Sequence, residues 1–405
     1  MKKCLVVIIA ICCFVHMGLA QDWVQVSSLP ASYQTDHTFG FALGDKGYVV
    51  AGRTNSGVKS DFYSYDALDD EWTKLDDFPG GPRGFSIGDT WDGKAYFGFG
   101  VDEFERKNDL WVFDPLNETW TELASCPCAP RTHPAMVAIG GKVYVGLGGG
   151  EFGNLGDWWA YDIELNTWEE LADFPAAERH HPFQFGIGDF VYVGFGHGDG
   201  FISRRWYQYD PLNDSWAEVA SIPAEGRVAG TQFSFNGKGY ILSGDGQDHR
   251  SMESGEFWSY DPAIDSWEEL PPHPDFSRWA PASFVLNGEV YLINGPNTDV
   301  SPIQYRDEIY KFDLVGMSDV DDVNFISTRA LQVRPNPTNL LLQLNVQDDA
   351  IDQFHDYRIV NLDGRVVSSG KLNDQSIDVS GLPASLYFID ISNDEAILSA
   401  KFLKL

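Results

Sequence analysis

The chain has 405 residues, 28 of them basic and 60 acidic, so its formal net charge at neutral pH is −32. A surface this acidic repels nucleic acid and anionic lipid, which argues against partners of either kind. Aromatic residues make up 14% of the chain, enough for a large apolar core that does not depend on disulfides.

Residues 1–20 have the pattern of a secretory signal peptide. Lys2 and Lys3 precede an apolar run at residues 5–15, and small residues (Gly18 and Ala20) stand before the expected cleavage site. The run is too short for a transmembrane helix, and no later run approaches that length. We therefore expect a mature chain that begins at Gln21, lies outside the cytoplasm and has no membrane span.

From about residue 22 to residue 315 a set of marks recurs with a period of 48 residues, slightly longer near the end. Each unit has a tyrosine four residues before a glycine, then an aromatic–Asp pair, then a tryptophan. The repeat glycines are Gly52, Gly100, Gly148, Gly196, Gly244 and Gly295. The repeat tryptophans are Trp72, Trp120, Trp168, Trp216 and Trp267, with Trp23 in a partial unit at the start.

The pattern inside each unit predicts four short β-strands. Apolar and polar residues alternate over short runs separated by Gly or Pro, which is typical of strands and not of helices. A repeat of this length with a Gly and Trp signature is typical of one blade of a β-propeller. In one unit we expect strands near residues 133–139, 142–148, 158–162 and 167–172. The loops after the second and fourth strands share one face, and because they are the longer loops we expect ligands there.

These marks resemble the kelch repeat, whose units usually carry two glycines after the tyrosine. The second glycine is kept in all six units, whereas the first is replaced by Ala51, Phe99, Leu147, Phe195, Ser243 and Asn294. The resemblance implies an all-β chain with a six-bladed kelch-type β-propeller at residues 21–315. It does not assign a function, because the fold hosts many unrelated ones.

Half a unit stands at each end of the repeat array. Residues 22–30 are similar to the outer strand at 119–127, whereas residues 307–313 supply inner strands with no tryptophan after them. Together the halves make one blade, so we expect the N-terminal outer strand with Trp23 to complete the sixth blade. Closing the ring removes two exposed sheet edges.

The repeat pattern stops after Asp313. Residues 316–329 are interpreted as an acidic linker, with a calcium site as the alternative. Residues 330–405 alternate strand patterns with Asn-Asp and Asp-Gly turns, which predicts a small C-terminal β-sandwich. Segments 333–338, 357–364 and 377–387 resemble the C-terminal sorting domain of the type IX secretion system, although Ser385 replaces a usual glycine. The resemblance implies a secreted or outer-surface protein of a diderm bacterium, with the secretion machinery as a partner of residues 330–405.

Only two cysteines, Cys126 and Cys128, lie outside the signal peptide. Cys126 occupies the position held by Phe78, Phe174 and Ile222 in other units, so we interpret it as a small core residue. A disulfide or a metal pair with Cys128 is the alternative.

Candidate ligand-binding residues gather on the predicted loop face. An arginine follows the repeat proline by four residues in five units: Arg83, Arg131, Arg179, Arg227 and Arg278. These arginines either pair with acids or carbonyls inside each blade, or converge and bind a ligand. In the second case acidic sugars are preferred, with Arg131, Arg179 and Arg227 as the main contacts. The other candidates on this face are His133, His181, His197, Glu151, Asp199 and Trp279. The same openings and loops hold His37, His180, His249, Arg53 and Asp245.

This composition suits a sugar or a small anion. No GxSxG, HExxH, P-loop or dinucleotide motif is present. A zinc-type site of His133, His181 and His197 is the alternative to a metal-free site, but nothing in the spacing requires it, so we expect no metal and no cofactor. A copper oxidase of the galactose-oxidase type would need a Cys–Tyr cross-link that core cysteines do not supply.

Two functional hypotheses remain. The favoured one is a noncatalytic, monomeric surface module that binds a glycan or a protein on the loop face. The alternative is an enzyme on sugars, similar to N-acetylneuraminate epimerase, to which residues 79–83 and 292–295 show a faint resemblance. A bound sugar without turnover distinguishes the first hypothesis from the second.

Overall fold

The computed structural model describes residues 23–300, 303–315, 331–334, 338–346, 354–361, 366–372, 376–393 and 397–404. The predicted signal peptide and the predicted linker at 316–329 lie outside these residues. Apart from one 3-10 turn, η1 (Ala31–Tyr33), the secondary structure of the described residues is entirely β. None of their helices is long and apolar enough to cross a membrane.

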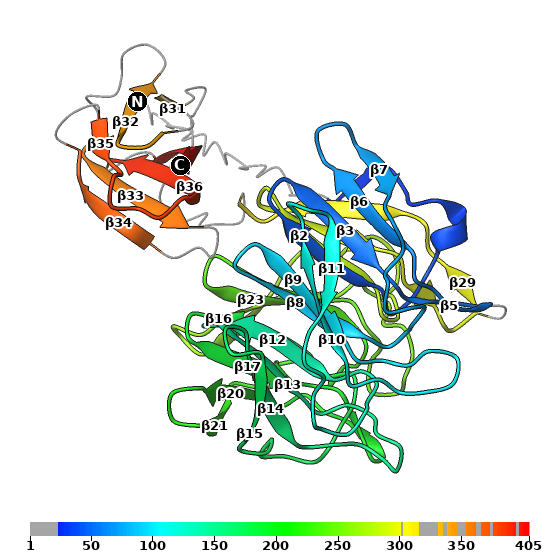
Figure 1. Cartoon of the computed structure of the whole chain (residues 1–405). Coiled ribbons are helices and arrows are strands. Elements are labelled where there is room, and N and C mark those ends of the chain that lie inside the picture. Colours follow the sequence, from blue (N-terminus) through cyan, green and yellow to red (C-terminus); the bar gives the residue numbers. More distant parts are fainter. Residues whose placement is uncertain are drawn as a thin grey trace, which may run out of the picture.

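Six four-stranded antiparallel sheets follow one another along the described part of residues 24–313 (Figure 1). The first comprises β2 (Phe39–Leu43), β3 (Lys46–Val50), β6 (Phe62–Asp66) and β7 (Glu71–Lys74). The second comprises β8 (Ile87–Trp91), β9 (Lys94–Gly98), β10 (Leu110–Asp114) and β11 (Thr119–Glu122). The third comprises β12 (Ala135–Ile139), β13 (Lys142–Gly146), β14 (Trp158–Asp162) and β15 (Thr167–Leu171).

The later sheets repeat this plan. The fourth comprises β16 (Phe183–Ile187), β17 (Phe190–Gly194), β20 (Trp206–Asp210) and β21 (Ser215–Val219). The fifth comprises β22 (Thr231–Phe235), β23 (Lys238–Leu242), β24 (Phe257–Asp261) and β25 (Ser266–Glu269). The sixth comprises β26 (Ala282–Leu286), β27 (Glu289–Ile293), β30 (Ile309–Asp313) and the N-terminal β1 (Val24–Val26). An all-β chain built from four-stranded units, as in a kelch β-propeller, is confirmed.

The β1 strand is antiparallel to β30, with Val24 opposite Lys311. The loops after the second strands carry two-stranded ribbons: β4 (Arg53–Thr54) with β5 (Gly57–Val58), β18 (His197–Gly198) with β19 (Phe201–Ile202), and β28 (Pro296–Asn297) with β29 (Gln304–Tyr305).

The repeat tryptophans connect neighbouring sheets. The indole N–H of Trp168 donates a hydrogen bond to the carbonyl of Ala124, which lies four residues after Trp120 in the preceding unit. The same offset holds for four further pairs: Trp72 with Ser27, Trp216 with Ala172, Trp267 with Ala220, and Trp23 with Pro271. Trp120 differs, because its Nε1 is buried without a partner. One tryptophan per unit therefore ties most sheets to the sheet before them.

The repeat glycine that lies two residues after each second strand is required by backbone geometry. Gly148 has φ +98°, and a Cβ there would lie 2.7 Å from the carbonyl oxygen of Thr132. The residue before it, Leu147, also has a left-handed φ of +59°, although it is not glycine. The first glycine of the kelch pattern can thus be replaced, at a cost in backbone strain, whereas the second has no room for a side chain.

Cys126 and Cys128 are both buried and form a disulfide with each other. The interpretation of Cys126 as a core residue agrees with its place in an apolar cluster, and the disulfide given as the alternative is present as well. Because one residue separates the cysteines, the bridge restricts the unfolded chain very little, and the core holds this unit together.

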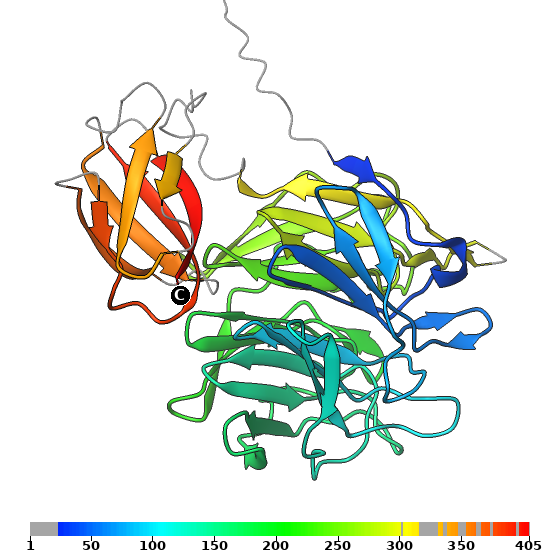
Figure 2. The same ribbon diagram turned by 45° about the horizontal axis from the view of Figure 1, so that its top comes forward.

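The C-terminal part consists of two β-sheets (Figure 2) and has its own apolar core. One sheet contains β31 (Leu331–Arg334), β32 (Leu341–Val346) and β35 (Ser376–Asp378). The other contains β34 (Val366–Lys371), β33 (Asp356–Asn361), β36 (Ser385–Ser392) and β37 (Ile397–Lys404). Residues of both sheets, among them Leu342, Ile359 and Phe402, form one apolar cluster.

Candidate functional site

One repeat position, two residues before the first strand of each sheet, brings the six units together. This position holds His37, Phe85, His133, His181, Ala229 and Ala280, and all six have a left-handed φ between 42° and 60°. Backbone N–H groups bond from unit to unit, from His37 to the carbonyl of Ala280 at 3.0 Å and from His181 to that of His133 at 3.2 Å. The six residues therefore lie next to one another where the units meet.

Three histidines of this set converge. The Nε2 atoms of His37 and His181 are 2.9 Å apart, and the ring centroids of His133 and His181 are 3.5 Å apart. One ring nitrogen from each of the three lies within 4.8 Å of the others. The histidine set considered from the sequence needs correction, because His37 occupies the place given there to His197.

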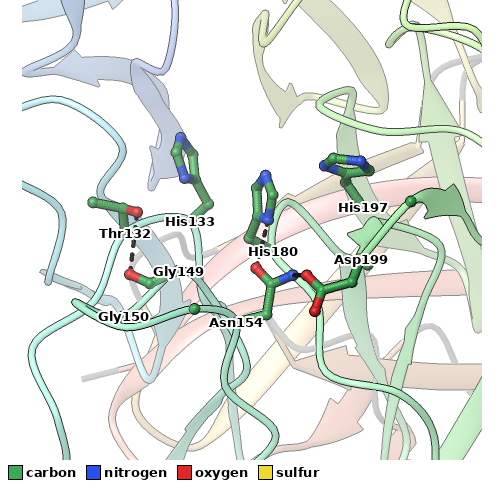
Figure 3. Close-up of a pocket in the computed structure, with 11 residues that line it drawn as sticks. Thr132, His133, Gly149, Gly150, Asn154, His180, His197 and Asp199 are labelled. Atoms are coloured by element: carbon green, nitrogen blue, oxygen red, sulfur yellow. Dashed lines mark hydrogen bonds between the residues drawn. The ribbon is translucent and has the colours of Figure 1, made fainter.

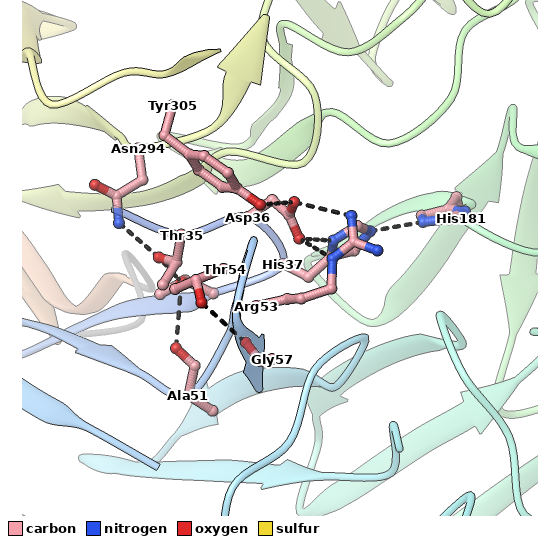
Figure 4. A network of polar contacts seen from close by, with 11 residues as sticks. Thr35, Asp36, His37, Ala51, Arg53, Thr54, Gly57, His181, Asn294 and Tyr305 are labelled. Carbon is pink, nitrogen blue, oxygen red and sulfur yellow. Dashed lines mark hydrogen bonds and ion pairs between the residues drawn. The ribbon is translucent and has the colours of Figure 1, made fainter. Parts of the chain in front are cut away.

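A buried polar network orients His37 (Figure 4). His37 Nδ1 donates to Asp36 Oδ1 at 2.6 Å, and Arg53 donates to both oxygens of the same carboxylate at 3.0 Å. The hydroxyl of Tyr305 donates to Asp36 Oδ2 at 2.9 Å. Burial raises the pKa of Asp36, but His37 and Arg53 outweigh it and lower that pKa to about 2. With Nδ1–H held by an ionised carboxylate, His37 points its unprotonated Nε2 toward His181.

The other two histidines carry buried nitrogens without partners. Both ring nitrogens of His133 and Nδ1 of His181 are buried and make no hydrogen bond. Burial lowers the pKa of both imidazoles well below the usual value, and nearby histidines lower it further. Burial therefore favours the neutral form of these two imidazoles, which is the form that ligates metal ions.

A pocket of about 390 Å³ adjoins this cluster (Figure 3). It lies between the third and fourth sheets and is lined by Thr132, His133, Gly149, Gly150, Gly153, Asn154, His180, His197, Gly198, Asp199 and Gly200. Asn154 Oδ1 accepts a hydrogen bond from His180 Nδ1 at 2.7 Å, and its amide donates to Asp199 at 3.3 Å. Burial and then the neighbouring histidines lower the pKa of His180 to about 4.

The other candidates predicted from the sequence lie in different places on this face. His133, His197 and Asp199 line the pocket, whereas the ring centroid of Trp279 lies 5.3 Å from that of His181. Glu151 is exposed in the same loop as Asn154 but does not line the pocket.

Sequence reasoning missed two exposed aromatic side chains beside the pocket. Phe152 is 96% exposed between two lining glycines, and Phe201, 40% exposed, follows the lining Gly200. Phe104, 86% exposed, lies in the corresponding loop of the second sheet. The recurrence of a phenylalanine in the loop after the second strand of three successive units is visible in the sequence and could have indicated these side chains.

The five repeat arginines are buried inside the sheets, and their side chains are not presented to solvent. Arg131 donates to both oxygens of Asp157 at 2.7 Å and to the carbonyl of Leu147 at 3.0 Å. Arg83 pairs likewise with Asp109, Arg227 pairs with Glu256, and Arg278 donates to the carbonyls of Asn294 and Glu308. This geometry contradicts the expectation that Arg131, Arg179 and Arg227 are main ligand contacts, and it favours a structural role.

Arg179 departs from this pattern. The position that holds Asp157 in the third unit holds Arg205 in the fourth, and both residues offer their backbone carbonyl to the same repeat position. Arg179 donates to the carbonyls of Ala177 and Phe195 but has no carboxylate partner among the described residues. Burial, and more weakly the cation of Arg205, lower the pKa of Arg179 to about 10.

Comparison with family models agrees with this architecture. Residues 130–175 match the Kelch motif, and residues 332–404 match the secretion system C-terminal sorting domain. The chain thus carries a kelch motif followed by a type IX sorting domain. No relative was found among the curated proteins. The sorting domain makes the kelch-repeat protein a secreted or cell-surface protein of a Gram-negative bacterium and implies contact with the secretion machinery.

The kelch-repeat protein carries a buried carboxyl whose charge depends on pH near neutrality. Burial, together with the charges of Asp299 and Asp248, raises the pKa of Asp245 to about 7. The folded state then holds a proton that the unfolded state has lost, so the stability from this proton is complete below pH 4 and disappears as pH rises through 7. At pH 8 we expect Asp245→Asn to raise the free energy of unfolding above that of the parent by about 2–4 kcal/mol. At pH 4 we expect little difference between the two proteins.

Urea unfolding of both proteins between pH 4 and pH 8 measures this effect. Glu253→Gln is the control, because Glu253 is exposed in the same loop and is not among the charges that raise the pKa of Asp245. Parallel stability curves for the parent and Asp245→Asn over this range would show that Asp245 is ionised throughout.

Proposed function

We propose that the six sheets are the blades of one closed propeller and that its loop face binds a neutral glycan outside the cell. The observation that carries the proposal is the pocket between the third and fourth sheets. There, side chains that donate and side chains that accept hydrogen bonds lie beside two exposed phenylalanines, Phe152 and Phe201.

Contacts between the first and last units support a closed ring. The β1 strand extends the last sheet, and the indole of Trp23 donates to the carbonyl of Pro271. Residues of the first and last sheets also share one apolar cluster that includes Val49, Tyr63 and Phe284. Such a ring, at residues 21–315, leaves residues 330–405 as a separate sorting unit.

The pocket lining favours a ligand rich in hydroxyl groups. Asn154 and Asp199 offer side-chain oxygens that accept hydrogen bonds, and the imidazoles of His180 and His197 offer ring nitrogens that donate or accept them. No Lys or Arg lines the pocket among the described residues, and the nearest repeat arginines are buried. An acidic sugar therefore finds no cationic partner there, whereas a neutral sugar ring can stack on Phe152 or Phe201.

Glycan binding is the direct test. A panel of neutral and acidic oligosaccharides presented to the mature protein should select neutral glycans. Asn154→Ala and Phe152→Ala should each weaken binding about 3–10-fold, because each removes one hydrogen bond or one stacking surface. Leu212→Ala is the matched control, since Leu212 is 91% exposed in a turn between β20 and β21.

Selection of acidic glycans only, or affinities unchanged in both pocket variants, would contradict the proposal. The bound sugar is then tested for change of anomeric form by NMR. Catalysed interconversion would favour the sugar enzyme over the noncatalytic module.

A further inference from the structure

We propose that His37, His133 and His181 bind one late transition-metal ion of the zinc class. The ion would lie where the units meet, beside the pocket. The inference does not rest on the proposed function, because the three ligands are not among the proposed glycan-contacting residues Asn154 and Phe152.

The spacing of the ring nitrogens suits a single ion. One nitrogen from each histidine lies within 4.8 Å of the other two. Nitrogens bound to tetrahedral Zn²⁺ at 2.0–2.1 Å lie about 3.3 Å apart, so small rotations bring the three onto one centre. The 2.9 Å contact between His37 and His181 would open slightly as the ion replaces their hydrogen bond.

The three-histidine cluster destabilises the folded protein, and a bound ion would offset this effect. Three of its ring nitrogens are buried without a partner, and all three histidines have a left-handed backbone. The units do not require histidine at this position, because Phe85, Ala229 and Ala280 occupy it in the other three. Three strained imidazoles that point at one another, two of them with unsatisfied ring nitrogens, are the arrangement expected of a ligand set.

The surroundings have the features of a metal site. Asp36 holds Nδ1–H of His37 and is itself held by Arg53 and Tyr305, as the carboxylates behind metal-bound histidines usually are. Three imidazoles select zinc, nickel, copper or cobalt over calcium and magnesium, which prefer oxygen ligands.

The site would also leave one coordination position open. Three protein ligands are the number found in catalytic zinc sites, where the fourth position holds water or substrate. His133 lines the pocket as well as belonging to the cluster, so a molecule in the pocket would lie close to the ion.

Zinc titration of the chelator-treated mature protein, made without a histidine tag, tests the proposal. We expect one Zn²⁺ per chain by calorimetry, and a Co²⁺ complex whose visible spectrum shows tetrahedral nitrogen ligation. His133→Ala should weaken zinc binding about 100-fold or more, and Asp36→Asn about 10–100-fold. Alanine is tolerated at this position, as Ala229 and Ala280 show, so His133→Ala should remain folded.

The matched control is His249→Ala, which removes an exposed histidine of the same face outside the cluster. It should leave both the stoichiometry and the affinity unchanged. His133→Phe, which copies Phe85, is the second variant and should abolish binding while keeping the fold. Absence of stoichiometric zinc binding in the parent, or binding that survives both His133 variants, overturns the proposal. Glycan binding measured in the presence of chelator tells this failure apart from a failure of the proposed function.

Discussion

Removal of residues 21–30 is expected to unfold the whole repeat array and not merely to loosen one end. The deletion takes away β1 and Trp23, which complete the last sheet and contact the fifth. It leaves β30 with an unpaired edge, and the core shared by the first and last sheets loses Leu29. Far-ultraviolet circular dichroism and the melting temperature of the truncated chain measure the effect.

A single substitution isolates the tryptophan. The ring of Trp23 packs against Phe257 at 5.7 Å and Phe312 at 5.1 Å. Trp23→Ala should lower the free energy of unfolding by about 3–5 kcal/mol, since it leaves a cavity between two sheets. Val24→Ala is the matched control, because Val24 is 52% exposed on the same strand. If the truncated chain melts at the temperature of the parent, the ring is not closed by its N-terminal strand.

Arg131→Ala should destabilise the protein by about 3–5 kcal/mol, because it breaks a buried ion pair and leaves Asp157 without its partner. The carbonyl of Leu147 also loses a donor. Arg179→Ala should cost less, since no carboxylate is left unpaired in that unit. Urea unfolding of the two variants gives the comparison directly.

A substitution that supplies the missing carboxylate in the fourth unit provides an internal control. Arg205→Asp places a carboxylate where the third unit has Asp157, so it should raise stability by pairing with Arg179. A melting temperature unchanged in Arg131→Ala, together with loss of glycan binding, would instead assign these arginines to ligand recognition.

The regular part of the fold was predictable because it repeats. The predicted strands at 142–148, 158–162 and 167–172 coincide with β13, β14 and β15 to within two residues. The repeat made each strand visible several times, and alternation of buried and exposed side chains follows directly from strand geometry. No local sequence pattern distinguishes a disulfide between Cys126 and Cys128 from two separate core cysteines, so the sequence alone did not decide between them.

The site was less predictable, because it depends on which side chains meet across units. Asp157 follows Arg131 by the interval that separates Asp109 from Arg83, so the ion pairs had a signal in the sequence. The three histidines also share one repeat position, at intervals that are multiples of 48 residues. His197 lies in a loop after a second strand and not at this repeat position, so the spacing itself favours His37 over His197. What spacing does not reveal is that the three side chains point at one another.

The pairing of β1 with β30 imposes an order on the assembly of this protein. The β1 strand has its partner at the far end of the repeat array, where Val24 lies opposite Lys311. The other sheets can form from contacts within one unit, but the last sheet needs two segments that are nearly 290 residues apart (Val24 and Lys311), and such distant pairings form slowly. Until then, the two unmatched edges need protection from other chains in the periplasm. The acidic charge of the whole chain, −32, supplies some of that protection by keeping partly assembled copies apart.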